Sequence, residues 1–596
     1  MAHIENKGPQ VYHFYMTTKK TDISRIGPSF LLVTAAVLFL YSVTGMTAAH
    51  LNAVRTAVLF GFFISFCAFY TVSRIKDIKT GLLGLAAGVI CGPVSYFALD
   101  AAFNSVQRMT IECFGIMMRF LLWGGIGCVA LAVITLICAK KFKTEDAVFA
   151  VLLAGFVLRA ILVIFTPLNF HQHDVNGFGE GFQGFHDDYI MFIYEHWSLP
   201  TGDVRDLGQL YHPPLHHFLS AVFFKINSLI FPKLAGEINV LKTLPFLYTS
   251  WFVLISHRLL KHFKIEGAPL VIALAFISFH PQMLFLSIQV NNDALMTVLF
   301  AASVYLAIKW YEKPELTTIL FIAITIGCAM MAKLSGGLVA FPVAFLFLCK
   351  LISAIRKKVR IKTGELIKQF VLFALLVFPL GMWFPMKNFI LYGTPFTYVF
   401  PIDSTANQDL WMFSPWQRIF APSSESLKIP FMTTKSNDPA VDYNIYVSLL
   451  KTSLFDERSF ENGYLMNTGR VMFVVAAVMV LICTISAVYA AIKLKKEKKL
   501  TAGFISLLVL CSVLLICYVK WCFDYPVACT ESFRYIIPVL PAAGVFLGMA
   551  AQKLWKNIPV RVIVTGVMIL FICSVFAFYG TYSEYRSVWE SLIRPA

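Results

Sequence analysis

The residues best suited to chemistry gather in one polar stretch, residues 169–219, within an otherwise apolar sequence. Carboxylates and imidazoles are the usual general acids and bases of enzymes, once their surroundings tune their proton affinity. So many titratable groups between two apolar segments predict a reaction site at an edge of a membrane. The stretch holds His171, His173, His186, His196, His212, His216, His217, Asp174, Asp187 and Asp188.

Asp174 is the first candidate for a general base, because it comes a few residues after an apolar run that ends at Pro167. Apolar walls at that depth can tune a carboxylate for proton abstraction. A solvated loop aspartate is the other interpretation. We expect His173 and His212 to be neighbours that shape Asp174. Further active-site candidates are Tyr211, His186, Asp187 and Asp188, of which either aspartate can supply the second carboxyl group that a glycoside hydrolase needs.

The same stretch permits a metal site. His171, His173 and Asp174 offer donor atoms that suit Zn²⁺ or Mn²⁺, and the two-residue spacing of the histidines fits a loop or a strand. A divalent metal therefore stays open as a cofactor, although basic side chains can do the same electrostatic work.

Three charged residues lie further along the chain, at the expected ends of apolar segments. Asp293, in QVNNDALM, can act in the site or cap a helix N-terminus. Lys333, in MMAKLSGG, can bind a phosphate together with the amides that follow it, or extend to the membrane surface. Arg534, in ESFRYIIPVLP, has the same two interpretations, phosphate clamp or interfacial anchor. The histidine of His280-Pro281, inside an apolar run, is more typical of a packed core residue.

The composition requires a polytopic membrane protein, because 58% of the residues are hydrophobic and only 14% are charged. Lys and Arg exceed Asp and Glu by 17, but they fall in short segments between apolar runs. That pattern indicates cytoplasmic connectors and membrane lipids as neighbours rather than a nucleic-acid partner. Most of the 13 cysteines lie inside apolar runs as packing residues. Cys522 and Cys529 flank a short polar segment in which a disulfide can persist if it lies outside, and their pairing stays open.

The apolar runs predict about fifteen membrane spans, since about 20 residues cross a hydrocarbon core of roughly 30 Å. Basic connectors at 74–79, 140–143, 258–264, 356–362 and 493–499 set their direction, because such loops stay in the cytoplasm. The spans are expected at about 28–46, 53–72, 81–101, 117–139, 146–166, 240–260, 267–288, 294–310, 315–333, 336–352, 368–391, 468–492, 500–518, 533–552 and 560–580.

The segment 214–231 is long enough to cross but is interrupted by His216, His217, Lys225 and Asn227. If it crossed, the basic connectors that follow it would face outside. We therefore expect an amphipathic helix in the outer interface, entered through the turn that begins at Tyr211. The result is a multi-pass cell-membrane protein with the N-terminus in the cytoplasm and the C-terminus and the polar stretch outside.

The predicted organisation has four parts. Residues 1–145 form a four-span extension of unknown role, and residues 146–391 form a membrane core with its first external loop at 167–212. Residues 392–467 are too long for a turn and too rich in aromatic residues for a disordered linker, so we expect an ordered extracytoplasmic loop or subdomain. Residues 468–596 supply the last membrane helices.

Five short motifs follow one another along the chain. They are the outward helix that ends in an acidic loop, YHPPL (Tyr211–Leu215), NND (Asn291–Asp293), KLSG (Lys333–Gly336) and FRYIIPVLPA (Phe533–Ala542). In this order, over about residues 146–580, they resemble the protein-mannosyltransferase-like glycosyltransferases, family 39 of the GT-C fold. The aminoarabinose transferases that act on lipid A are relatives in this class.

The resemblance implies an inverting transfer of sugar from a polyprenyl-phosphate donor to an extracytoplasmic acceptor, which is an envelope glycan, a lipid or a protein. By position, Asp174 matches the proposed general base and Asp293 the acidic residue of the second external loop. Lys333 and Arg534 match basic positions that hold the donor phosphate. The sequence departs from the protein mannosyltransferases at Val175, where they have a glutamate directly after the first aspartate.

Two other function classes are compatible with the composition. A transporter or flippase of lipid-linked sugars would show broken helices or mid-membrane polar residues in paired halves, and the sequence shows no such pairing. A non-catalytic membrane scaffold would use the four extra N-terminal spans to dock a partner.

Overall fold

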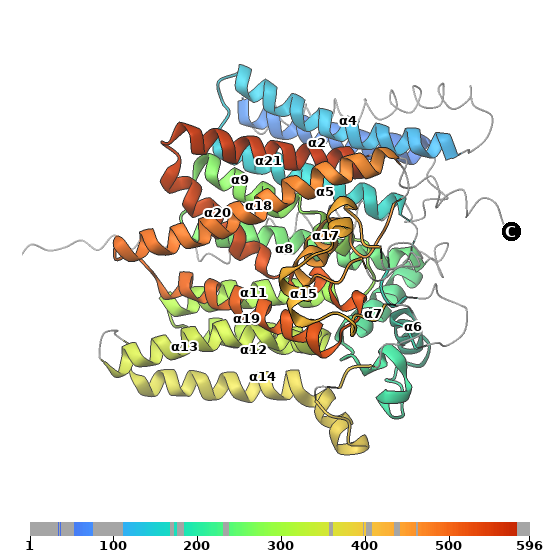
Figure 1. The fold of residues 1–596 in the computed structure, drawn as a ribbon, viewed down its shortest axis with the longest axis vertical. Coiled ribbons are helices and arrows are strands. Elements are labelled where there is room, and N and C mark those ends of the chain that lie inside the picture. The colour runs from blue at the N-terminus through green and yellow to red at the C-terminus, as the bar shows by residue number, and fades with distance from the viewer. Residues whose placement is uncertain are drawn as a thin grey trace, which may run out of the picture.

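All the regular structure of the described residues is helical, which confirms the predicted all-α fold class. The computed structural model describes residues 34, 36, 53–75, 111–166, 168, 172–175, 184–230, 238–356, 361–396, 398–400, 408–433, 441–460 and 463–580. Asp409 and Val527 form an isolated antiparallel bridge. The long helices lie side by side, with their axes roughly parallel to one another (Figure 1).

The long apolar helices confirm a multi-pass membrane protein. Within the described ranges, nine helices are long and apolar enough to cross a membrane, or ten if the bent pair before and within α20 counts as one span. The predicted spans 28–46 and 81–101 fall outside the described residues. The other predicted spans correspond to α2 (Ala53–Ile75), α4 (Ile111–Cys138), α5 (Thr144–Phe165), α8 (Thr243–His262), α9 (Gly267–Ser278), α11 (Asp293–Glu312), α12 (Leu316–Ala332), α13 (Ala340–Ile355), α14 (Thr363–Tyr392), α18 (Gly463–Lys496), α19 (Ala502–Asp524), α20 (Val539–Leu554) and α21 (Ile558–Tyr579).

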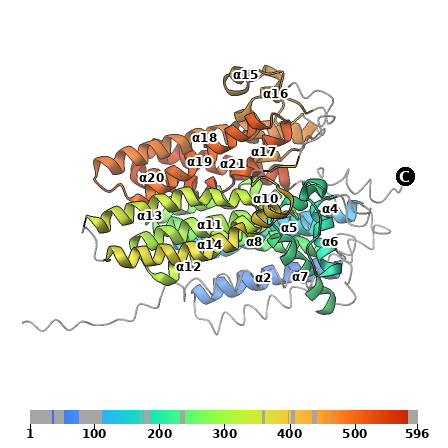
Figure 2. The same ribbon diagram turned by 90° about the horizontal axis from the view of Figure 1, so that it is seen from below.

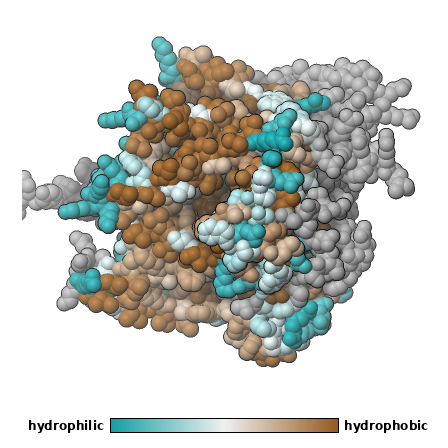
Figure 3. Space-filling view, in the orientation of Figure 1, coloured by the Kyte–Doolittle hydropathy of each residue, from teal (hydrophilic) through white to brown (hydrophobic). Residues whose placement is uncertain are grey.

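The helices form two packed groups (Figure 2). In one group, α11 packs on α12 and α12 packs on α14; in the other, α18 packs on α20 and α21. Contacts of α9 with α20 and α8, together with the contact of α8 with α11, join the groups. Large apolar side chains remain exposed on the outer helices, such as Phe378 of α14 and Leu481 of α18. Figure 3 shows this hydrophobic cover along the helices, as a membrane-spanning bundle requires.

The connectors that we expect in the cytoplasm gather at one end of the bundle. Three ion pairs join them: Lys553 to Glu497 at 2.7 Å, His262 to Glu312 at 3.1 Å, and Arg74 to Asp146 at 2.9 Å. The opposite end carries α6 (His186–His196), α7 (Leu215–Ile230) and α17 (Ile445–Phe455) (Figure 1). The connectors thus lie at one end of the bundle, as the charge pattern requires. That this end faces the cytoplasm remains a prediction.

The prediction of one continuous span over 267–288 is wrong. Helix α9 ends at Ser278, and a second helix, α10 (Pro281–Leu286), starts after His280. Proline has no N–H to donate and disfavours a helical residue before it, so the chain turns there. The backbone N–H of Gln282 donates to the His280 ring, which caps α10. His280 is therefore a buried capping residue, in line with a structural role.

The predicted span 533–552 is also interrupted. A short 3₁₀ helix, η9 (Phe533–Ile536), precedes α20, and the two helical parts meet at a bend of 57°. Pro538 stands at this break. The bend separates Arg534 from the regular part of the span and directs it toward neighbouring loops.

A buried arginine links α5 to the end of α9. Arg159 is 2% exposed and donates from Nη1 to the carbonyl oxygen of Ser278 at 3.1 Å. The last carbonyl groups of a helix lack partners within the helix and carry partial negative charge, so a cation at this place is favourable. Arg159 thereby satisfies the open end of the short helix α9.

The predicted ordered segment between α14 and α18 contains three helices in its described parts: α15 (Pro415–Phe420), α16 (Ser424–Lys428) and α17. Buried ion pairs hold this segment. Arg418 contacts Glu531 at 2.7 Å, and Lys451 contacts Asp442 at 2.6 Å. It is therefore packed onto the α19–α20 connection rather than extended.

Helix α7 forms where the interfacial helix was predicted. One face buries His216, Ser220 and Phe224, whereas Phe218 and Leu229 on other faces are exposed. This pattern suits a helix that rests on the bundle and presents apolar side chains outward. Its depth relative to a membrane remains a prediction.

Candidate active site

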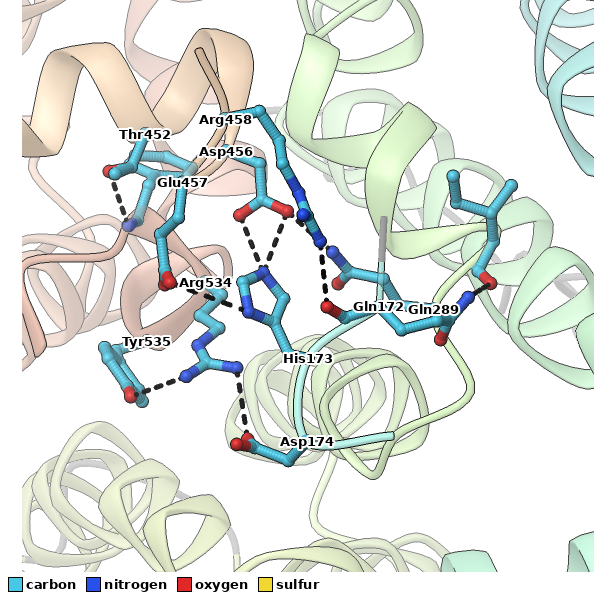
Figure 4. A network of polar contacts seen from close by, with 12 residues as sticks. Gln172, His173, Asp174, Gln289, Thr452, Asp456, Glu457, Arg458, Arg534 and Tyr535 are labelled. Atoms are coloured by element: carbon cyan, nitrogen blue, oxygen red, sulfur yellow. Dashed lines mark hydrogen bonds and ion pairs between the residues drawn. The ribbon is translucent and has the colours of Figure 1, made fainter. Parts of the chain in front are cut away.

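The candidate site lies where several helix ends meet at the end of the bundle that carries α6 and α17. Asp174 follows α5, Asp293 begins α11, Lys333 ends α12, and Arg534 belongs to η9. Figure 4 shows the part of this region around Asp174, Arg534 and Tyr535, whose polar groups face one another. Asp293 and Lys333 stand at the ends of α11 and α12, so the packing of these helices positions them, whereas Asp174 lies in the loop that follows α5.

Asp174 forms an ion pair with Arg534, with 3.8 Å between Oδ2 and Nη1. The Asp174 side chain is 40% exposed, whereas that of Arg534 is 10% exposed. The main chain of Asp174 has a left-handed φ of 56°, and its carbonyl oxygen accepts the His186 N–H at 2.9 Å. Asp174 is therefore a fixed, partly accessible carboxylate rather than a freely solvated one.

Two opposing effects act on the proton affinity of Asp174. Burial among protein atoms raises its pKa, but the positive charge of Arg534, with a smaller contribution from Lys333, lowers it more. The net pKa of Asp174 lies below its ordinary value. The carboxylate is thus ready to accept a proton at neutral pH.

Lys333 and Asp293 form a second ion pair, with 2.6 Å between Nζ and Oδ1. Asp293 is 2% exposed and is the first residue of α11, whose N-cap is Asn292. The predicted alternative, Asp293 as the capping residue, is therefore wrong. Lys333 contacts Asp293 and the ring of Tyr535 instead of extending to the surface, because both lie directly beside it.

Arg534 is anchored by its neighbour in sequence. Its Nη2 donates to the Tyr535 hydroxyl at 3.1 Å, and its guanidinium lies 5.0 Å from the centre of that ring. The side chain is enclosed, so the alternative of an exposed interfacial anchor does not describe it. Nothing in the sequence singles out Tyr535, which the fold places between two cations.

Four histidines of the polar stretch, His186, His212, His216 and His217, form a buried aromatic group. His186 Nδ1 lies 2.8 Å from His217 Nε2, and the rings of His186 and His212 stack with centroids 5.4 Å apart. Burial lowers the pKa of His186 to about 4, and it lowers the pKa of His212 as well. These rings are neutral at pH 7 and form a wall of the site instead of supplying charge.

The remaining candidates of the stretch differ in position. Asp188 accepts the Phe185 N–H at 2.9 Å and so caps α6, whereas Asp187 is buried in the first turn of this helix. Tyr211 packs on His212 and Tyr398 and lines a small cavity next to Leu334, the neighbour of Lys333. Asp188 therefore has a structural role, and Tyr211 lines a small cavity together with Leu334.

The structure gives His173 partners that the sequence did not indicate. Its Nε2 lies 2.8 Å and 2.9 Å from the two carboxylate oxygens of Asp456, and its Nδ1 lies 3.7 Å from Glu457 Oε2. Asp456 also accepts Gln289 Nε2 at 2.8 Å. Asp456 and Glu457 belong to the segment SLFDERSF. Nothing in the sequence indicates that Asp456 contacts a histidine 283 positions earlier.

The structure does not test the predicted metal site of His171, His173 and Asp174 as a set. His171 lies outside the described residues. In the part of the chain that the structure describes, the group able to hold a metal is His173, Asp456 and Glu457, whose ligand atoms lie within 4.8 Å of one another. The two carboxylates face different nitrogens of the His173 ring, so a single ion could not use both contacts as they stand.

Cys522 and Cys529, considered as a disulfide, are both free thiols. Cys522 is buried, and its Sγ contacts the carbonyl oxygen of Thr530 at 3.8 Å. It is a packing residue beside Arg418, whose Nη2 donates to the Cys522 carbonyl at 2.8 Å.

Comparison with known proteins gives one family. Residues 211–383 match the model of the dolichyl-phosphate-mannose-protein mannosyltransferases. No curated protein sequence matches the chain. The matched segment contains Tyr211, Asp293 and Lys333 and stops before Arg534. Over this segment the chain is similar to the dolichyl-phosphate-mannose-protein mannosyltransferases, which confirms the resemblance seen in its motifs and supports a polytopic membrane glycosyltransferase of the GT-C type.

Proposed function

We propose that this protein transfers a sugar from a polyprenyl-phosphate donor to a hydroxyl group of an extracytoplasmic acceptor, with inversion at the anomeric carbon. The acceptor is an envelope glycan, a lipid or a protein. One observation carries the proposal: Asp174, Lys333 and Arg534 come from distant parts of the chain, and both cations contact Tyr535 while Arg534 also pairs with Asp174.

In this reaction Asp174 acts as the general base. The acceptor oxygen forms a bond to the anomeric carbon while its proton passes to the Asp174 carboxylate. The bond from the anomeric carbon to the phosphate oxygen breaks, and its electron pair stays on the phosphate. The partial exposure of Asp174 leaves room for an acceptor hydroxyl next to it.

Lys333 and Arg534 stabilise the charge that develops on the departing polyprenyl phosphate. Their ion pairs with Asp293 and Asp174 hold them in place before the donor binds. One carboxylate and two cations are enough, because a lipid phosphate is already a good leaving group.

The proposal is tested by transfer of radiolabelled sugar from polyprenyl phosphate in proteoliposomes, comparing wild type with Asp174→Asn. Loss of a general base lowers the rate by about 100- to 10,000-fold. Asp206→Asn, in the same external region, is the matched control and should keep wild-type transfer. Full transfer by Asp174→Asn would overturn the assignment of the base, and no transfer by wild type with any polyprenyl-phosphate sugar would overturn the proposed reaction.

A further inference from the structure

His173, the residue directly before the proposed base, is held from two sides by consecutive acidic residues that follow α17. Asp456 meets Nε2 at 2.8 Å and 2.9 Å, and Glu457 meets Nδ1 at 3.7 Å. His173 and Asp456 are almost fully buried, with side chains 8% and 0% exposed. We call His173, Asp456 and Glu457 the histidine clamp (Figure 4).

Asp456 makes this contact from a strained backbone conformation. Asp456 has φ 56° and ψ −154°, a strained combination that residues other than glycine rarely adopt. Its N–H donates to the Thr452 carbonyl at 3.1 Å, which ends α17. Its Oδ2 also accepts Gln289 Nε2 at 2.8 Å. The surrounding contacts therefore aim this carboxylate at His173.

The clamp belongs to a larger set of contacts around residues 172–174. Gln172 donates to the Ile288 carbonyl and accepts the Val290 N–H, both at 2.7 Å, and its own carbonyl accepts Arg458 Nη2 at 3.0 Å. Asp174, two positions later, has the left-handed φ of 56°. The base is thus presented by a short chain segment whose two preceding side chains are both fixed.

We propose that Asp456 and Glu457 are positioning residues for the transfer reaction, which orient Asp174 by holding His173. This inference rests on the proposed function, because the clamp affects the reaction only by orienting the proposed base, Asp174. It also gives the segment between α14 and α18 a direct part in the active site. Neither acidic residue needs to touch the donor or the acceptor.

A metal site is the competing explanation of the same three residues, since their ligand atoms lie within 4.8 Å of one another. The contacts favour the clamp. Each carboxylate faces a different ring nitrogen, and the two nitrogens of an imidazole point in different directions.

The experiment compares Asp456→Asn, His173→Gln and the double variant in the proteoliposome assay, with kcat and donor KM measured separately. Misplacing a catalytic group by about 1 Å can cost about 100-fold in rate. We expect kcat to fall by about that factor in each single variant while donor KM stays within about two-fold, because the phosphate-binding cations are untouched. The double variant should be no slower than the slower single variant, since both changes break one contact. Asp456→Glu should restore part of kcat.

A matched control separates positioning from general loss of structure. Asp442→Asn removes a buried carboxylate of the same segment, which contacts Lys451 at 2.6 Å and lies outside the clamp. It should lower the melting temperature and leave kcat of the folded protein at the wild-type value. Equal loss of kcat in Asp442→Asn and Asp456→Asn, or additive losses in the double variant, would overturn the positioning role.

Two further measurements distinguish the clamp from a metal site, and failure of the proposed function from absence of the His173–Asp456 contact. Transfer that is lost with EDTA and restored by Zn²⁺ or Mn²⁺, with tight metal binding that disappears in His173→Gln, would establish a metal site and overturn the clamp. Nitrogen-15 NMR of labelled histidine, with His173 assigned by His173→Gln, should show a carboxylate-bonded Nε2 that changes in Asp456→Asn. If wild type transfers no sugar, the proposed function fails, and an unchanged His173 signal in Asp456→Asn would separately disprove the contact itself.

Discussion

The Lys333 ammonium and the Arg534 guanidinium lie against the same aromatic ring, 5.1 Å and 5.0 Å from the centre of Tyr535. Cation–π contacts contribute about 0.5 to 2 kcal/mol each. Replacing the ring in Tyr535→Leu should therefore raise donor KM about 2- to 30-fold. Tyr535→Phe keeps the ring and should stay near wild type. Equal effects of both substitutions would assign the role to the hydroxyl group, which Arg534 contacts, rather than to the ring.

Removal of the Lys333 charge should impair donor use and also disturb folding. Lys333→Met loses a charge-assisted phosphate contact, which lowers kcat/KM about 10- to 100-fold. It also leaves Asp293 buried without its partner, which costs about 3 to 5 kcal/mol. The double variant Lys333→Met/Asp293→Asn should recover thermal stability without recovering transfer. If it recovers both, Lys333 serves only to neutralise Asp293.

Arg534 should control the acidic limit of the reaction. A base works when deprotonated, and the pKa of Asp174 lies below its ordinary value, so the acidic limb of wild-type kcat/KM should lie below the pH at which an ordinary aspartate titrates. In Arg534→Gln the effect of burial on Asp174 is no longer offset by that charge, and the pKa of Asp174 rises. The acidic limb of the pH profile should then move to higher pH. An unmoved limb would show that Asp174 and Arg534 do not interact in the working enzyme.

The pair Arg418–Glu531 should stabilise the segment between α14 and α18 without acting in the reaction. Its side chains are 3% and 0% exposed, so Arg418→Met leaves a buried carboxylate unpaired and destabilises the protein by about 3 to 5 kcal/mol. Arg418→Met/Glu531→Gln should regain much of this loss. Differential scanning fluorimetry in detergent measures both, and a melting temperature of Arg418→Met equal to wild type would contradict the prediction.

The two ends of the bundle should face opposite sides of the membrane. Single accessible cysteines at Lys499, in a basic connector, and at Ser424, in α16, provide the test after the native cysteines have been replaced. In sealed, oriented vesicles an impermeant maleimide should label Ser424→Cys from the outside and Lys499→Cys only after the membrane is opened. Labelling of both from one side would refute the predicted topology.

Local properties of the sequence predict most of the helices. Runs of apolar residues located α11, α14, α18 and α21, because the membrane requires about 20 such residues in each span. The same criterion failed at His280-Pro281, where the apolar run continues although the helix stops. Hydropathy measures transfer into lipid and is insensitive to a missing backbone N–H, so it cannot detect that break.

The candidate site was predictable only where motifs mark it. Asp174, Asp293, Lys333 and Arg534 were selected from short patterns, and the structure brings them together. Asp456 has no such pattern, since its partner is determined by how α17 packs rather than by its neighbours in sequence. The contact between His173 and Asp456, which are 283 positions apart, depends on the packing of the folded chain.

The contact between Arg159 and Ser278 also constrains how the protein is made. A membrane protein enters the bilayer one helix at a time, and Arg159 lies 119 positions ahead of the carbonyl group that receives it. An arginine at the centre of a helix costs about 2.5 to 3.5 kcal/mol on insertion. During synthesis, the Arg159 charge on α5 therefore lacks its partner until α9 has been made. We expect the insertion machinery to retain α5 until then. A nascent chain cut before Ser278 should release α5 from the translocon less readily than one cut after it.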